Sequence, residues 1–161
     1  GKDRKTQFER TNQMVSGMVS RNVMPAGTQV NINGKSGKRA NYVDVYSQVN
    51  IKNGGPRTLA HELGHHIEHK SPGMFAKAKA FWEQRTAGEA YVSLRSATGA
   101  NYARGETTKR DKWTHPYMGK TYRNGTELIS MGIEYLLSEP TTLLRQDPEY
   151  FYFLINVLQG G

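Results

Sequence analysis

The sequence predicts a small α+β domain, with a short sheet beside a helix that carries an HELGH motif and a second, glutamate-bearing helix. Three observations predict this class. Residues 57–70 place apolar side chains at helical spacing around the motif, whereas residues 30–51 alternate apolar and polar positions as strands do. The later segment 127–137 is apolar on most of its circumference, as a buried helix is. A chain of 161 residues is long enough for one domain and short for two, so we expect residues 1–161 to form a single domain.

The first part of the chain, residues 1–56, is predicted to hold a helix and two strands. Apolar residues recur near helical spacing over 6–22, and the run stops before a proline and a glycine. Alternation then predicts strands at 30–32 and 43–51. The sequence NGKSG at 33–37 predicts a turn between them, so we expect the two strands to be joined by a basic hairpin loop.

The second part, residues 57–161, is predicted to hold the metal-binding portion. Proline and glycine punctuate it and set the expected ends of its helices. The expected elements are a helix at 57–70, a helix at 74–85, loops with short strands at 91–122, a helix at 127–137 that ends before Pro140, and a helix from Asp147 to a stop at Gly160.

Charge and composition exclude several classes of function. The net charge of +8 permits attraction to nucleic acid or anionic lipid, but the basic residues are dispersed and not interleaved with aromatic ones, so we expect no specific nucleic-acid site. No stretch approaches the ~20 apolar residues of a membrane-spanning helix, which predicts a soluble domain with no membrane partner. The N-terminus has no apolar signal segment, so we expect a domain that acts inside a cell or belongs to a longer chain. Without cysteine, any zinc site must use histidine and carboxylate ligands.

The motif HELGH at 61–65 carries the strongest functional signal. A helix places His61 and His65 on one face, so both imidazoles can bind one metal ion. Glu62 lies beside the first ligand, where it can act as general base toward a water whose pKa zinc lowers to about 7. Gly64 is small enough for another backbone to approach. The pattern therefore predicts a zinc-dependent hydrolase.

The neighbouring His66 and His69 raise the alternative of a histidine-rich surface helix. His69 lies eight residues from His61, about 12 Å along the axis, so these two histidines cannot share one ion bound at ~2.0 Å. The pair His65 and His69 also lacks an adjacent carboxylate to act as base. We expect His66 and His69 to pack or to support the ligands from behind.

A catalytic zinc ion usually takes a third protein ligand. The extended motif with glycine at 68 and histidine at 71 is absent, because Glu68 and Ser71 stand there. A carboxylate on a later helix is the usual alternative, and Glu127 is favoured because a carboxylate on a buried helix needs a cation or hydrogen-bond donors. Glu134 lies two turns on along the same face, so one of the two can ligate while the other orients a ligand histidine. The further alternatives are Glu89 and Asp44.

Four blocks of the chain carry a family resemblance. They are LAHELGHHIEH at 59–69, PYMGKTY at 116–122, TELISMGIEYL at 126–136 and DPEYF at 147–151. On these blocks the chain resembles the zincin-like domains of phage head morphogenesis (minor head) proteins and of some prophage or polymorphic-toxin proteins. The resemblance covers about the last two-thirds of the chain and leaves residues 1–56 largely unassigned.

The resemblance implies a small zincin-like fold and zinc bound by His61, His65 and Glu127. It also implies a metallopeptidase of a phage or other mobile element, acting on a protein or peptide substrate such as a phage capsid or host protein. Such a protein acts in the cytoplasm, in a virion, or in a host cell into which a larger protein delivers it. Met131 stands where relatives often have an aspartate that orients the first histidine, and Glu134 or Ser130 can take that role.

Zincins commonly direct a tyrosine or histidine at the charge that develops on the substrate. The candidates are His115, Tyr117 and Tyr122, and we select Tyr117 as the catalytic one. The strand before the metal helix can pair with an extended peptide substrate. One rival interpretation is a repressor-clearing metalloprotease of mobile elements, with the Glu89 region as acidic ligand. Another is a zinc-stabilised structural virion module, or one that contacts nucleic acid, without catalysis; a fourth protein ligand would support it.

Overall fold

The computed structural model describes residues 2–31, 40–43 and 48–161 and has a mixed architecture of helices and small sheets. The α+β class predicted from the sequence is confirmed at this level. The helices are α1 (Lys2–Met18), α2 (Pro56–Lys70), α3 (Met74–Arg85), α4 (Leu94–Thr98), the 3-10 helix η2 (Pro116–Gly119), α5 (Leu128–Ser138), α6 (Pro140–Gln146) and α7 (Pro148–Leu158). The strands are β1 (Gln29–Asn31), β2 (Asn41–Val43), β3 (Gln48–Asn50), β4 (Val92–Ser93), β5 (Thr107–Thr108), β6 (Thr121–Tyr122) and β7 (Gly125–Thr126).

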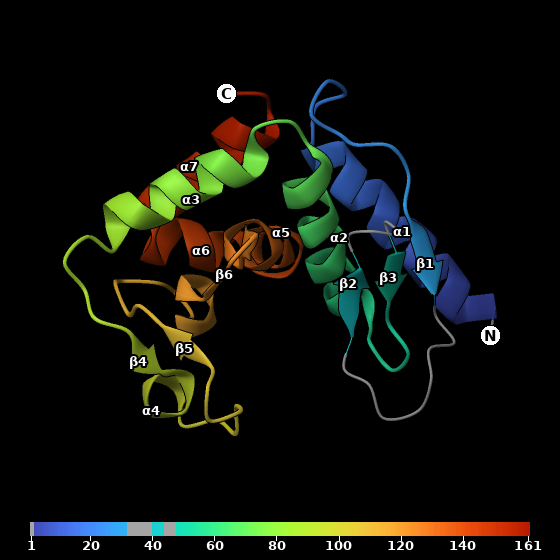
Figure 1. The fold of residues 1–161 in the computed structure, drawn as a ribbon. Coiled ribbons are helices and arrows are strands. Elements are labelled where there is room, and N and C mark those ends of the chain that lie inside the picture. The colour runs from blue at the N-terminus through green and yellow to red at the C-terminus, as the bar shows by residue number, and fades with distance from the viewer. Residues whose placement is uncertain (1, 32–39, 44–47) are drawn as a thin grey trace.

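Helix α2 lies at the centre of the molecule. Figure 1 shows α1 and the three-stranded sheet on one side of α2, with α3, α6 and α7 on the other side. Leu59, Leu63 and Ile67 of α2 are buried in the core, which also contains Val15 of α1 and Leu154 of α7. Among the described residues, no helix is long and apolar enough to cross a membrane.

The three-stranded sheet has the order β1-β3-β2. Strand β2 pairs with β3 in antiparallel orientation, whereas β1 pairs with β3 in parallel orientation, with Val30 opposite Val49. The predicted hairpin between strands 30–32 and 43–51 is therefore wrong. The second predicted strand, 43–51, begins where β2 ends and contains β3; β2 and β3 pair with each other, and β1 pairs with the opposite edge of β3. The predicted turn at 33–37 lies outside the described residues.

The start and end of α2 follow from its sequence. Pro56 occupies the first helical position, where its missing N–H removes no intrahelical hydrogen bond, and two glycines precede it. Ser71 adopts an extended conformation and is followed by Pro72, which cannot continue the helix. The predicted helix 57–70 is confirmed to within one residue, and the predicted helix 74–85 matches α3.

Helix α5 crosses α2 at Gly64. A Cβ atom on Gly64 would lie 2.5 Å from the Cα of Ser130 and 3.1 Å from the carbonyl oxygen of Ile129. The two backbones can approach this closely only because residue 64 has no side chain. The crossing brings the start of α5 to the histidine face of α2, and the close approach expected at Gly64 is confirmed.

The C-terminal region contains one helix that the sequence pattern did not predict. Pro140 suggested a stop, but it occupies the first turn of a new helix, α6, where proline is well tolerated. The predicted start at Asp147 is confirmed, since its side chain accepts a hydrogen bond from the N–H of Tyr150 at 3.1 Å and caps α7.

Short elements connect α3 to α5, as predicted for residues 91–122, with the short helix α4 in addition. Strands β4 and β5 form one antiparallel pair, and β6 and β7 form another. The second pair ends at Thr126, and Glu127 separates it from the first residue of α5, Leu128. Tyr122 of β6 therefore lies beside the start of α5, where its hydroxyl donates to Glu127.

Candidate metal centre

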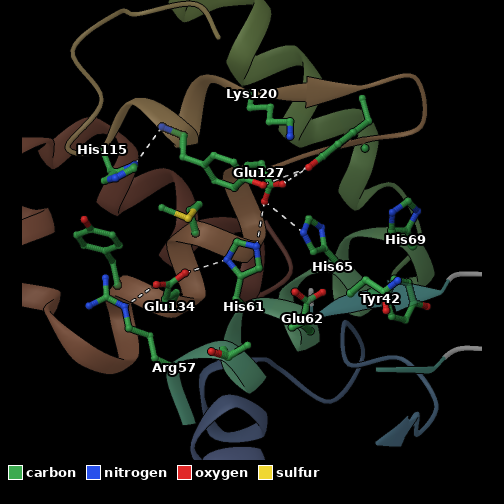
Figure 2. A pocket seen from close by; sticks show the side chains of 18 of the residues that line it. Tyr42, Arg57, His61, Glu62, His65, His69, His115, Lys120, Glu127 and Glu134 are labelled. Atoms are coloured by element: carbon green, nitrogen blue, oxygen red, sulfur yellow. Dashed lines mark hydrogen bonds and ion pairs between the residues drawn. The ribbon is translucent and has the colours of Figure 1, made fainter. Parts of the chain in front are cut away.

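Two histidines of α2 and one glutamate at the start of α5 meet in one cluster. His61, His65 and Glu127 each offer one ligand atom, and these atoms lie within 4.8 Å of one another. The Nε2 atoms of both histidines are 3.2 Å from the same oxygen of Glu127, Oε2 (Figure 2). The structure thus brings together the three residues that the sequence ranked first as metal ligands.

The hydrogen bonds of His61 favour a cation between its Nε2 atom and Glu127. The Nδ1 atom of His61 lies 2.8 Å from Oε2 of Glu134, so Nδ1–H donates to that carboxylate and the Nε2 lone pair faces Glu127. A lone pair and a carboxylate oxygen repel each other unless a proton or metal ion lies between them. Burial lowers the pKa of His61, but hydrogen bonds to Glu127 and Glu134 raise it to about 10, so in the absence of metal a proton fills this place. Two imidazoles and one carboxylate are a donor set that zinc accepts.

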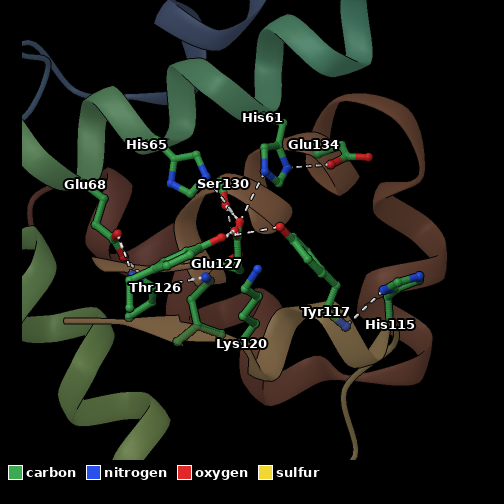
Figure 3. A network of polar contacts seen from close by, with 12 residues as sticks. His61, His65, Glu68, His115, Tyr117, Lys120, Thr126, Glu127, Ser130 and Glu134 are labelled. Atoms are coloured by element: carbon green, nitrogen blue, oxygen red, sulfur yellow. Dashed lines mark hydrogen bonds and ion pairs between the residues drawn. The ribbon is translucent and has the colours of Figure 1, made fainter. Parts of the chain in front are cut away.

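Glu127 is buried, with 1% of its surface exposed, and its carboxylate is surrounded by donors. Tyr122 donates to Oε1 at 2.5 Å, and Ser130 donates to Oε2 at 2.7 Å (Figure 3). Burial alone would raise the pKa of Glu127, but its hydrogen bonds with His61 and His65 hold it well below the usual value. The side chain therefore stays ionised, as a metal ligand must.

Glu134 lies on the opposite side of the His61 ring from Glu127. It contacts Nδ1 of His61 and accepts a hydrogen bond from Nε of Arg57 at 2.5 Å. Burial raises the pKa of Glu134, but the hydrogen bonds with His61 and Arg57 lower it below its ordinary value. Arg57 also contacts Glu139 at 3.2 Å. Glu134 is placed to orient His61, the role left open for it as an alternative to ligation.

The other sequence candidates for the third ligand lie elsewhere. Glu89 accepts a hydrogen bond from the N–H of Asp111 at 2.9 Å and does not belong to the cluster. Asp44 lies outside the described residues.

The cluster opens onto a cavity of about 860 Å³. Glu62 is 6% exposed and lines this cavity, and Figure 2 shows its carboxylate beside the imidazoles of His61 and His65. Tyr42 of β2 lines one wall, and Lys120 and Tyr122 line another. A substrate in the cavity can therefore reach the candidate metal position and the candidate base together.

The three candidates for stabilising developing charge, His115, Tyr117 and Tyr122, all line the cavity, but they differ in their hydrogen bonds. The Tyr122 hydroxyl donates a hydrogen bond to Glu127, so it supports that carboxylate. The Tyr117 hydroxyl lies 3.4 Å from the Tyr122 hydroxyl and its ring stacks on Tyr102, which fixes its position. The Nδ1 atom of His115 accepts a hydrogen bond from the N–H of Tyr117, and burial lowers the pKa of His115. His115 is therefore neutral at pH 7, with its proton on Nε2.

The remaining histidines of α2 have separate roles. His66 is buried, with Nδ1 3.0 Å from the Tyr42 hydroxyl and Nε2 2.8 Å from the carbonyl oxygen of Ala26. It packs against Ala26 and Tyr42, outside the cluster of His61, His65 and Glu127. His69 lines the cavity and stacks on the Tyr42 ring. Neither joins the three-residue cluster.

Sequence reasoning missed two residues that support the site, Arg57 and Glu68. Arg57 holds Glu134, and the buried carboxylate of Glu68 accepts hydrogen bonds from the N–H and hydroxyl of Thr126 (Figure 3). Burial raises the pKa of Glu68 to about 7 against these hydrogen bonds. The only sequence signal for Glu68 was a carboxylate three residues after His65, next to the apolar stripe of α2.

No protein-family model matches the chain, and no curated protein or solved structure matches it either.

Proposed function

We propose that this domain is a zinc-dependent metallopeptidase that hydrolyses peptide bonds of a protein substrate. The observation that carries the proposal is the position of the ligand cluster at a large cavity that Glu62 also lines. In the zincin arrangement, His61, His65 and Glu127 would hold the ion. Structural zinc sites usually use four protein ligands, whereas catalytic sites use three and keep one position open.

The chemistry divides between the ion and the chain. Zinc would supply a Lewis acid and a water of lowered pKa. Glu62 would accept the proton of the attacking water and deliver it to the leaving amine, since its carboxylate lines the cavity beside the imidazoles of His61 and His65. Tyr117 and the neutral His115 would donate hydrogen bonds to the substrate oxygen on which negative charge develops.

The cavity wall suggests how a peptide would lie. Among the strands that the structure describes, β2 is at an edge of the sheet, and Asn41 and Tyr42 line the cavity. An edge strand can pair with an extended peptide through main-chain hydrogen bonds. This arrangement favours an unfolded or extended segment of a protein as substrate. The link to a phage or other mobile element, and to capsid or host proteins as substrates, rests on the sequence resemblance.

A structural zinc module is the other candidate function, and a module of this kind should bind zinc through a fourth protein ligand. Within the described part of the chain, the ligand group comprises three residues and opens onto the cavity. This geometry supports the enzyme over the structural module.

The test is cleavage of a proteome-derived peptide library, read by mass spectrometry. The zinc-loaded parent should cleave it, and Glu62→Gln should bind zinc equally well but cleave about 10²–10⁴-fold more slowly, because only the base is lost. Glu83→Gln, an exposed glutamate on α3, is the matched control and should behave as the parent does. Equal cleavage by Glu62→Gln, or none by the zinc-loaded parent, would overturn the proposal.

A further inference from the structure

Glu68 presents both carboxylate oxygens to one residue, Thr126. Oε2 accepts the backbone N–H of Thr126 at 2.9 Å, and Oε1 accepts its hydroxyl. Both residues are buried, with 2% and 1% of their surfaces exposed. Glu68 lies one turn after His65 on α2, and Thr126 directly precedes Glu127. The contact therefore joins the helix that carries two ligands to the segment that carries the third (Figure 3).

The hydroxyl of Thr126 makes a second contact, which fixes the direction of its proton. Oγ1 accepts the N–H of Leu128 at 3.1 Å, so its own proton is directed at Glu68. The N–H of Glu127 donates to the carbonyl oxygen of Lys120 at 3.1 Å. Three successive N–H groups, at 126, 127 and 128, are thus held by different partners. The backbone that bears the third ligand is fixed on both sides of Glu127.

The approach of this segment to α2 also depends on Gly125. A Cβ atom there would lie 3.3 Å from Oε2 of Glu68 and 3.3 Å from Nε2 of His69, which is closer than ordinary van der Waals contact.

The two hydrogen bonds from Thr126 require a polar side chain at position 68. An apolar side chain there would leave the N–H and hydroxyl of Thr126 buried without an acceptor, at a substantial cost in the free energy of folding. The carboxylate satisfies both groups in one geometry.

From these contacts we infer that Glu68 is a positioning residue for the metal site, which acts through Thr126 to place Glu127 against His61 and His65. The inference rests on the proposed function only in assuming that the cluster binds zinc. It assigns Glu68 no contact with the ion or the substrate. Groups that orient metal ligands typically contribute 10–100-fold to metal affinity.

The test is the zinc dissociation constant, measured by competition with a chelator, in four variants. Thr126→Val removes the hydroxyl and Glu68→Gln removes the charged acceptor, and each should weaken zinc binding about 10–100-fold. Thr126→Ser keeps the hydroxyl and should remain near the parent. Thr86→Val is the matched control, because Thr86 is also fully buried and its hydroxyl donates to the carbonyl oxygen of Trp82 at 2.8 Å, outside the site.

If the lost hydroxyl only reduces general stability, Thr126→Val and Thr86→Val should both have a lower unfolding temperature in excess chelator and should bind zinc equally well. If Glu68 and Thr126 position Glu127, only Thr126→Val should bind zinc more weakly. Equal affinities for these two variants and the parent would overturn the inference. If Thr126→Val does not fold, an unchanged affinity in Glu68→Gln would overturn it in the same way. If the parent binds no zinc, the inference and the proposed function both fail. If zinc binding responds as expected but the parent cleaves no peptide, the positioning role stands and the peptidase does not.

Discussion

Substitution of Gly64 by alanine tests whether the α2–α5 crossing sets the metal site. The new Cβ would lie 2.5 Å from the Cα of Ser130, whereas carbon atoms in contact prefer about 3.5–4.0 Å. The nearest atoms to this Cβ are Cα and N of Ser130 and the carbonyl oxygen of Ile129, and all of them belong to the backbone. The two backbones must therefore separate by roughly 1 Å. Overpacking of this kind costs about 1–3 kcal/mol, and the higher helix propensity of alanine offsets about 1 kcal/mol of it. We expect a net loss of about 0–2 kcal/mol in the free energy of unfolding.

The same displacement should weaken zinc binding, because Glu127 lies at the start of α5 while both histidines lie on α2. Metal–ligand distances tolerate about 0.2 Å, so a shift near 1 Å should lower zinc affinity more than tenfold. Urea unfolding in excess chelator and chelator competition measure the two effects separately. Gly17→Ala in α1 is the control, since no atom lies within 4 Å of its added Cβ, and it should not destabilise the protein. A Gly64→Ala protein as stable as the parent, with unchanged zinc affinity, would refute the reasoning.

Three further predictions concern the ligands and the surface charge. Glu127→Gln should lower zinc affinity more than 100-fold, whereas Glu134→Gln should stay within the ~10–100-fold of an orienting group; equal small losses in chelator competition would mean that neither ligates. Although burial lowers its pKa, hydrogen bonds to Glu127 and Glu134 hold metal-free His61 at a pKa of about 10, so at pH 8 it is protonated and zinc must displace about one proton. Calorimetry in two buffers of different ionisation enthalpy should detect this proton, and a heat independent of buffer would contradict it. Any binding to DNA should be non-specific and fall steeply with added salt, and tight sequence-selective binding near physiological salt would show this to be wrong.

The sequence predicted those features that depend on one local pattern. The helical stripe and flanking prolines were enough to delimit α2, and the spacing of His61 and His65 put both on one face. The apolar character of residues 127–137 indicated a buried helix, and a buried carboxylate at its start pointed to Glu127. Each inference used residues close together in the chain, where helix geometry fixes relative positions.

Features that depend on pairing between distant segments could not be predicted. Alternation of apolar residues has the same period before and after a chain reversal, so it did not separate β2 from β3. Proline ends one helix and begins another equally well, so Pro140 did not reveal α6. Glu68 resembled a surface carboxylate in the sequence, because its partner Thr126 is 58 residues away.

The most direct test of the account is the structure of the zinc-loaded protein, with the metal located by anomalous scattering at the zinc edge. We predict one zinc ion per chain, bound by Nε2 of His61, Nε2 of His65 and a carboxylate oxygen of Glu127, with the fourth position open to the cavity that Glu62 lines. Zinc–nitrogen distances should be about 2.0–2.1 Å. A fourth protein ligand that closes the site, or an ion bound away from these three residues, would contradict the account.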